Sequence, residues 1–421
     1  MGQGRLWSRN FLLLGQGQLV SAAGDAVYRI AIGFWILAAT GSTALMGALL
    51  AASVVPRILL SPIGGAYADR VDRRWLLVGS DLGAGLAVLL LGLAALAGTI
   101  EVWMAFAVAV LLGAASAVFD PTVDAAVADV VPKKRLGQAN AAFALVGAGA
   151  AIAGNALGGF LYQALGAALL FLANGASFIA SAASELFLRM PAPKPSGAKP
   201  PVRRELRAGV EVVRRRPGLG TLFAATSAAH VGTTAVFVLL VPLFERAPHL
   251  GAGAYGLALG AMSAGALIGF LIVSALPVRA SRRLLVWLVA GAVAAGGFAA
   301  VPWLGTVGAM VPFMVAAGVG LSVQDTVLTT ALQLAVAPDM RGKLFGLRAT
   351  AVLSLGALSM LGAGALAEAL PLAHLITAAA AIALLSTIAT SLSPAARGLF
   401  AQHGSSPTTP ADRDSGRPRR G

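Results

Sequence analysis

The sequence lacks the residues and motifs on which several large protein classes depend. Its 421 residues include no cysteine, which excludes disulfide bonds and thiolate metal sites. The four histidines are scattered and do not have the spacing of metal ligands, so no metal site is predicted. The chain also contains no Gly-x4-Gly-Lys-Ser/Thr sequence, no HExxH motif and no recognisable catalytic triad. These absences predict a protein that is not an enzyme and needs no cofactor.

Charge is scarce as well. Charged residues make up 11% of the chain and hydrophobic residues 58%, and the mean hydropathy is +0.83. Soluble proteins have about 25% charged residues, so the composition argues against a soluble fold. A net charge of +14 would suggest a nucleic-acid partner in a soluble protein. Here the charges lie between long apolar stretches, which predicts an all-α integral membrane protein in a lipid bilayer, with no nucleic-acid partner.

Twelve apolar segments are each long enough to cross a bilayer, which takes about 20 apolar residues. The first segment is too long for the core of a signal peptide, so it is predicted to remain as a helix. The ninth and tenth segments are separated only by Pro302 and Trp303. The segments lie near residues 11–39, 44–66, 76–98, 102–125, 139–162, 165–188, 219–244, 254–276, 284–301, 304–329, 345–367 and 371–392.

The positions of lysine and arginine predict the orientation of these spans. Nearly all of the 31 basic residues fall in the terminal segments and in alternate connections between the spans. The opposite connections contain only Arg246, while Arg29 and Arg57 lie inside spans. Because basic residues mark the cytoplasmic side, both termini are predicted to be cytoplasmic in a multi-pass protein of the inner (plasma) membrane.

The spans divide into two related halves. Residues 47–77 resemble residues 256–286, with Gly47 aligned to Gly256 and the pair Arg73–Arg74 aligned to Arg282–Arg283. This repeat predicts two pseudo-symmetric six-helix halves, at 1–188 and 218–392, with a binding site between them near the middle of the bilayer.

The halves are joined by a central cytoplasmic loop at 189–217. Residues 205–216 could form an amphipathic helix on an anionic leaflet, but a solvated tether is the preferred interpretation. The tail at 393–421 is rich in Ser, Pro, Thr and Arg and is predicted to be disordered.

The loop between the second and third spans contains the most informative motif. Five of the six residues from Asp69 to Arg74 are charged. Gly65 would allow two helix ends to approach closely, and Asp69 could accept hydrogen bonds from arginines. Such a network could hold one packing of the bundle and release it in another. The alternative is a stop-transfer charge cluster with no role in switching. The predicted switch residues are Gly65, Asp69, Arg70, Arg73 and Arg74.

This pattern, Gly-x-x-x-Asp-Arg-x-x-Arg-Arg, resembles the signature of the major facilitator superfamily, which implies a secondary transporter with twelve helices. The start of the chain looks like the efflux-type branch that includes macrolide and siderophore exporters. The fifth span has part of an exporter motif, with Asn155 where proline is frequent. The fourth span lacks an arginine that is common in drug/proton antiporters. The residues that match the efflux branch include Asn10, Phe11, Gln18, Ser21, Gly24, Asp25, Trp35, Asp120, Pro121, Asn140, Gly154, Gly158 and Gly159.

Three ionisable residues are predicted to lie deep in the membrane. Asp25 and Arg57 fall near the middle of the first and second spans, and Arg29 follows Asp25 by one helical turn. An unpaired charge there costs about 3 kcal/mol or more, so pairing or a water-filled cavity is expected. Asp25 could carry a proton between Arg29, Arg57 and substrate. The equal alternative is a fixed structural pair between Asp25 and an arginine.

Further polar residues are candidates for gates and for the cavity wall. Aspartates near the cytoplasmic span ends could pair with Arg70, Arg73 or Arg341 as inside gates, although a salt bridge at a helix end is the more common role. The gate candidates are Asp81, Asp120, Asp124, Asp325 and Arg341, and the cavity candidates are Trp35, His230 and Gln324.

The sequence thus predicts a monomeric secondary transporter that works by alternating access. The favoured activity is proton-coupled export of small amphipathic compounds of drug, macrolide or siderophore type. The alternatives are a uniporter or importer of a metabolite, a lysophospholipid flippase, and a membrane sensor or scaffold that transports nothing.

Overall fold

The computed structural model describes residues 7–68, 70–190, 202–276 and 278–402, and these ranges contain helices but no strand. Short 3-10 turns at Lys133–Arg135, Ala280–Arg282 and Val301–Trp303 connect some of the helices. The α-helices are α1 (Arg9–Thr40), α2 (Thr43–Ala68), α3 (Arg73–Leu96), α4 (Val102–Val130), α5 (Leu136–Glu185), α6 (Val202–Arg215), α7 (Leu219–Arg246), α8 (Gly251–Ala275), α9 (Arg283–Ala300), α10 (Val307–Ala335), α11 (Pro338–Ala369), α12 (Leu372–Leu392) and α13 (Pro394–Phe400).

Within the described residues, 11 helices are long and apolar enough to cross a membrane. Each of them except α5 coincides with one predicted span, because long apolar runs favour helices that satisfy their own backbone groups. The difficult boundary at Pro302 and Trp303 is a 3-10 turn between α9 and α10. The total of twelve crossings stays a prediction.

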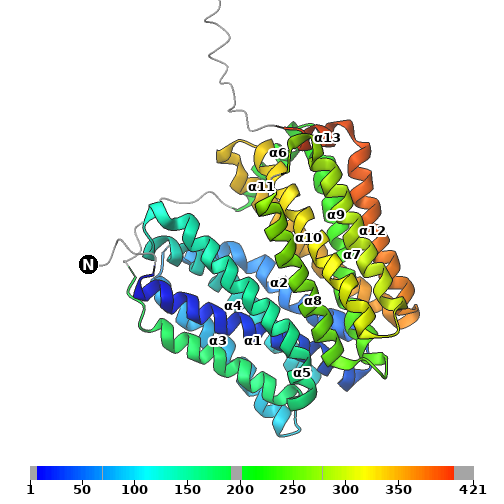
Figure 1. Cartoon of the computed structure of the whole chain (residues 1–421). Helices are drawn as coiled ribbons and strands as arrows, with labels where there is room; N and C mark the ends of the chain where they lie inside the picture. Colours follow the sequence, from blue (N-terminus) through cyan, green and yellow to red (C-terminus); the bar gives the residue numbers. More distant parts are fainter. Residues whose placement is uncertain (1–6, 69, 191–201, 277, 403–421) are drawn as a thin grey trace, which may run out of the picture.

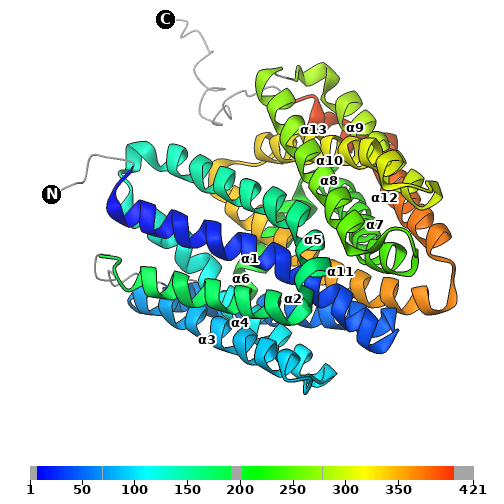
Figure 2. The ribbon, with the colours of Figure 1, turned by 60° about the horizontal axis from the view of Figure 1, so that its bottom comes forward.

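Helix α5 has 50 residues and contains a sharp reversal at Gly166. The φ angle of Gly166 is 73°, in the left-handed region that favours glycine. Before Gly166 the helix runs parallel to α1, with Gly154 and then Gly158 in contact with it. After Gly166 the chain runs antiparallel to α1, with Asn174 and then Ser181 in contact with it. The two parts lie as separate rods on either side of α1 (Figure 2). They correspond to the fifth and sixth predicted spans.

The helices form two bundles with repeated packing (Figure 1). Helices α1–α5 form the first bundle, called here the N-half, and α7–α12 form the second, the C-half. In the N-half α2 and α3 pack on α4, and in the C-half α8 and α9 pack on α10 in the same way. This repetition agrees with the internal sequence repeat, in which α2 corresponds to α8.

The two halves meet at one end of the molecule, called here the joined end. Helix α2 packs on α11, and α5 packs on α8. The backbones come close where Gly47 lies against Met360 and where Gly159 lies against Ala252, contacts that a side chain on either glycine would prevent. The side chain of Asn155 also donates to the hydroxyl of Ser263 across the same contact, at 3.2 Å.

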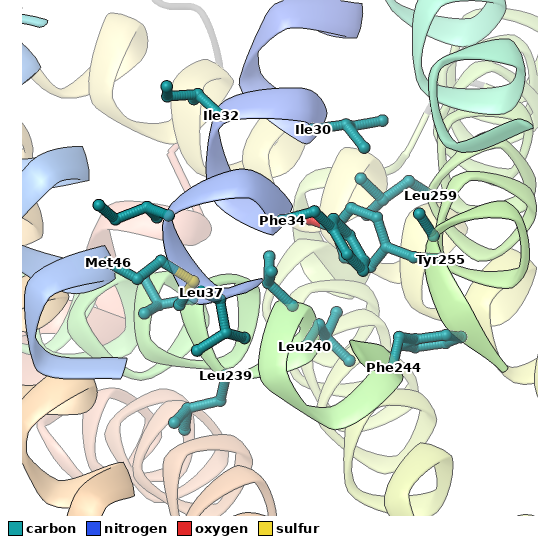
Figure 3. Close-up of a cluster of buried hydrophobic side chains, with 14 of the residues drawn as sticks. Ile30, Ile32, Phe34, Leu37, Met46, Leu239, Leu240, Phe244, Tyr255 and Leu259 are labelled. Atoms are coloured by element: carbon teal, nitrogen blue, oxygen red, sulfur yellow. The ribbon is translucent and has the colours of Figure 1, made fainter. Parts of the chain in front are cut away.

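A cluster of buried apolar side chains fills the joined end (Figure 3). The ring of Phe34 on α1 lies 5.3 Å from that of Tyr255 on α8, whose other neighbour, Phe244 on α7, is 5.7 Å away. Toward the opposite end the two bundles diverge (Figure 1). This divergent end carries the beginning of α1 and the short helices α6 and α13.

The part of the central loop from residue 202 onward folds against the protein. Residues 202–215 form helix α6, where the preferred expectation was a solvated tether. Gly209 on α6 packs against the backbone of Lys343 and the side chain of Leu347 on α11. The helical alternative therefore describes these residues, but this face of the helix contacts α11 instead of a lipid leaflet.

The expectation of disorder from residue 393 is wrong for the first part of the tail. Residues Pro394–Phe400 form helix α13, whose N-cap is Ser393. Phe400 is buried, and its ring lies 5.3 Å from that of Trp287 on α9. The backbone carbonyl of Gln402 accepts a hydrogen bond from Arg283 at 2.7 Å. Residues 403–421 lie outside the described ranges.

Candidate functional site

A cavity of about 370 Å³ lies in the N-half, between α1, α2, α3 and α4. Phe178 of α5 and Met360 of α11 complete its wall, so one residue of the C-half contributes. Its wall combines large apolar side chains with charged groups, as expected for a site that binds amphipathic molecules. The charged lining residues are Asp25, Arg29, Arg57, Asp81 and Asp120, and the large apolar ones include Ile32, Leu49, Leu50, Val54, Leu112 and Phe119.

Arg57 and Asp120 form an ion pair across this cavity. The distance from Nη2 of Arg57 to Oδ2 of Asp120 is 2.6 Å, and the side chains are 46% and 45% exposed. Asp25 was expected between Arg29 and Arg57, and Asp120 was expected in a cytoplasmic gate. Both assignments change, because Arg57 is engaged by Asp120 inside the cavity.

Asp25 occupies the same wall, one helical turn before Arg29. Its Oδ1 atom accepts a hydrogen bond from Nδ2 of Asn174 on α5, at 3.5 Å. The Asn174 side chain occupies the space beside Gly24, where a Cβ atom would displace it. With Arg57 held by Asp120, Arg29 is the cation among the described residues whose charge acts on Asp25.

A second cavity, of about 590 Å³, lies in the C-half between α7, α9, α10 and α11. It is lined by His230 and Gln324, both of which were expected to be cavity residues. The Gln324 amide donates to the hydroxyl of Thr387 at 3.1 Å, and Nε2 of His230 lies 3.2 Å from the hydroxyl of Thr234.

The other candidates are placed differently from the expectation. Asp325 lines the C-half cavity and pairs with Arg348 at 2.7 Å, whereas Arg341 donates to the backbone carbonyl of Gln333. Asp124 is exposed on α4. Trp35 is partly buried in the apolar core, where its ring lies 6.5 Å from that of Phe171.

Arg73 of the motif is the first residue of α3, and it contacts the ends of α2 and α4 within the N-half. Arg73 forms an ion pair with Asp129 on α4, and its Nε donates to the carbonyl of Ala68 at the end of α2. Arg70 is exposed, and Arg74 stacks over the ring of Trp75 at 5.2 Å. In this conformation Arg73 therefore holds helices of the N-half together, and neither its ion pair nor its hydrogen bond reaches the C-half.

The expected close approach at Gly65 is wrong in this structure. A Cβ atom at this glycine would have no described atom within 4 Å, and the neighbouring Gly64 packs against the backbone of Ala117 on α4 instead. Asp69 lies outside the described residues.

Sequence reasoning missed a buried polar group between α3 and α5. Asp81 is buried beside Ser181 and Glu185, where a gate residue at the cytoplasmic end was expected. Glu185 is the one acidic residue of an otherwise apolar segment, and this isolation is the signal that could have identified it. Asn174 interrupts the same apolar run and could have been found in the same way.

Comparison with known proteins gives a family. Residues 14–360 match the family model of the Major Facilitator Superfamily. The chain belongs to the major facilitator superfamily. This transporter is 26% identical over 385 residues to the uncharacterized MFS-type transporter YfiS of Bacillus subtilis, a match that covers 86% of this chain and 87% of the relative.

Two efflux proteins are also similar to this transporter over part of their length. Macrolide efflux protein A of Streptococcus pyogenes is 24% identical over 236 residues, covering 56% of this chain and 57% of that protein. Multidrug resistance protein MdtG of Escherichia coli is 28% identical over 165 residues, covering 38% and 39%. The chain thus matches little more than half, or less, of these two relatives.

Solved structures share the fold. A bacterial homolog of the human lysosomal transporter Spinster, in an inward-facing and unoccupied conformation, superposes with a TM-score of 0.69 at 15% identity, covering 95% of this transporter and 98% of that chain. The nucleoside transporter NupG gives a TM-score of 0.71 at 13% identity, covering 91% and 99%. The chain is therefore a multi-pass membrane transporter, a family whose members bind small molecules within the membrane and are not enzymes.

Proposed function

We propose that this transporter exports small amphipathic compounds across the inner (plasma) membrane in exchange for protons, and that it acts as a monomer. The single observation that supports this best is the N-half cavity, where three carboxylates and two arginines share a wall with apolar side chains. A compound with an apolar body and a charged group suits such a site. The similarity to macrolide and multidrug efflux proteins points to the same class of substrate.

The direction of export depends on the predicted orientation. With both termini in the cytoplasm, the divergent end faces the cytoplasm and the joined end faces outward. Substrate then enters both cavities from inside the cell. Rocking of the half at 1–188 against the half at 218–392 would separate the apolar cluster at the joined end and release substrate outside.

In this proposal Asp25 carries the coupling proton. Ionised Asp25 is held by Arg29 on the same helix and by the Asn174 amide. Protonation removes the attraction to Arg29, and a bound cationic substrate competes for the same carboxylate. Substrate and proton therefore exclude each other, which is the requirement for exchange.

The test is a flux measurement on the purified transporter in liposomes that contain a pH-sensitive dye. A panel of hydrophobic cations, macrolides and siderophores is added, and proton movement and substrate uptake are recorded together. Substrate-dependent proton release is expected for the wild type and should be absent in Asp25→Asn. Glu101→Gln is the control, because Glu101 is exposed in the loop before α4.

Three results would contradict the proposal. A rate of substrate transport that does not depend on the pH gradient would indicate a uniporter or flippase. Full proton coupling in Asp25→Asn would remove Asp25 from the mechanism. The absence of flux for every compound would favour a sensor or scaffold.

A further inference from the structure

Two carboxyl groups and a hydroxyl lie close together inside the N-half, between α3 and α5 at one side of its cavity. Asp81 on α3 is 2% exposed, and Ser181 and Glu185 on α5 are 3% and 2% exposed. Ser181 and Glu185 are one helical turn apart, so they share one face of α5, and Asp81 on the adjacent helix α3 interacts with both. We call Asp81 and Glu185 the carboxyl pair.

The carboxyl pair has no cationic partner among the described residues, and the group beside it is the neutral hydroxyl of Ser181, which can donate to one carboxylate only. Among the described residues, Oδ2 of Asp81, Oγ of Ser181 and Oε2 of Glu185 are buried and accept or donate no hydrogen bond. Neither carboxyl group forms an ion pair with a described lysine or arginine. Asp25 on α1 is the other ionisable side chain whose charge acts on Asp81, and it is acidic too.

Elementary electrostatics decides the charge of such a pair. Burying one unpaired carboxylate is costly, and two of them side by side repel each other as well. A shared proton removes one charge and supplies a donor to an otherwise unpaired oxygen. A hard metal ion would require about six oxygen ligands, whereas these three side chains carry five oxygens between them. Among the described residues no group of three or more acidic or histidine side chains is placed to hold a metal ion.

We infer that Asp81 and Glu185 hold a shared proton and form a second proton-binding site of this transporter. The inference rests on the proposed function only for its role in transport, since the shared proton itself follows from burial and geometry. Asp81 lines the N-half cavity whereas Glu185 lies behind it, so the proton enters and leaves through Asp81.

Helix α1 closes the site on its remaining side. A Cβ atom at Gly17 would lie 2.9 Å from Oγ of Ser181, so α1 and the second part of α5 leave no free space there. Asp25 lies two turns further along the same helix. A displacement of α1 on substrate binding at Asp25 would therefore also move Gly17, which packs beside the carboxyl pair. This movement would couple the two proton sites.

The experiment records the infrared C=O band of protonated carboxyl groups in the full-length transporter, reconstituted in lipid vesicles without substrate. At about pH 8 exposed carboxyl groups are ionised and contribute nothing to this band. The wild type should show the band, and Asp81→Asn and Glu185→Gln should each change it. The double variant should lose the contribution of the pair entirely, while Glu101→Gln keeps it.

Two milder variants protect the test against misfolding. Ser181→Ala should shift the frequency of the band, because it removes the hydroxyl beside the pair. Gly17→Ala should also shift it by displacing Ser181, whereas Gly15→Ala should not, because no atom lies within 4 Å of its new Cβ. In the flux assay Asp81→Asn should halve the number of protons released per substrate.

The inference is overturned if the wild type has no band, if the double variant keeps it unchanged, or if added sodium removes it, which would show a cation site instead. These outcomes are independent of the proposed function. A transporter that moves no protons could still show the band, and a proton antiporter that depends on Asp25 could lack it.

Discussion

At the scale of single residues, the ion pair between Arg57 and Asp120 is the feature with the clearest consequence. Because both side chains are about half exposed, their pairing should stabilise the fold by less than about 1 kcal/mol. Its effect on transport should be much larger, because the pair determines which cation remains available to Asp25.

We expect the substitution of Asp120 and the substitution of Arg57 to impair proton coupling for different reasons. Asp120→Asn frees Arg57 to bind Asp25, which would hold the carboxylate ionised. A charge-assisted hydrogen bond is worth about 1.5–3 kcal/mol, so proton release should fall about tenfold or more. Arg57→Gln leaves Asp120 to compete for Arg29, which should also impair coupling.

The double variant Arg57→Gln/Asp120→Asn restores the local charge balance. The double variant should release protons faster than Asp120→Asn alone. The thermal unfolding temperatures of both single variants and of the double variant should be close to that of the wild type. Additive losses in the flux assay would show that the two residues act independently.

The same scale shows what the sequence could and could not predict about the site. Asp25, Arg57, His230 and Gln324 were identified because polar residues inside apolar runs require a cavity or a partner. Which of them pair depends on distances between helices, which no local pattern contains. For the same reason Arg57 was assigned to Asp25, and the partnership of Asp325 with Arg348 was missed.

At the scale of elements, α13 is the part whose packing the sequence did not reveal. Its seven residues follow Ser393 and begin with Pro394, and the composition of the whole tail obscured a short helix with three buried apolar residues. The long spans were predictable, because each follows from a run of apolar residues that needs no partner to be helical. The placement of α6 on α11 likewise required the tertiary structure.

Phe400→Ala should destabilise the C-half. Phe400 is 1% exposed, and truncating a buried phenylalanine typically costs about 3–5 kcal/mol. The measurement is thermal or denaturant unfolding in detergent. Leu392→Ala serves as the control, since Leu392 is 74% exposed and its truncation should change little. Equal stability of the two variants would mean that α13 does not stay docked on α9 in solution.

At the scale of the whole molecule, alternating access requires the contacts of the joined end to break in every cycle. Asn155 and Ser263 form one such contact between the halves. A disulfide in the variant Asn155→Cys/Ser263→Cys would hold the halves together. The chain has no native cysteine, so no other disulfide can form.

Oxidation of this double variant should abolish transport, and a reducing agent should restore it to the level of the reduced protein. Each single cysteine variant should be insensitive to the oxidant, which controls for the loss of the Asn155 and Ser263 side chains. Transport that continues with the disulfide formed, as verified by mass spectrometry, would contradict a rocking motion between the halves.

The apolar cluster of the joined end also acts as electrical insulation. Water in a cavity that is open to one side of a membrane brings the electric potential of that side to the bottom of the cavity. The membrane voltage therefore falls across the apolar layer between the cavity and the opposite side. In this transporter that layer contains Phe34, Phe244 and Tyr255, and Arg29 lies on α1 little more than one turn before it. A unit charge that crosses the whole potential changes in energy by about 2.3 kcal/mol per 100 mV. Nearly all of that change would be concentrated in the few turns of helix around Phe34, which places the steepest electric field beside the charged groups of α1.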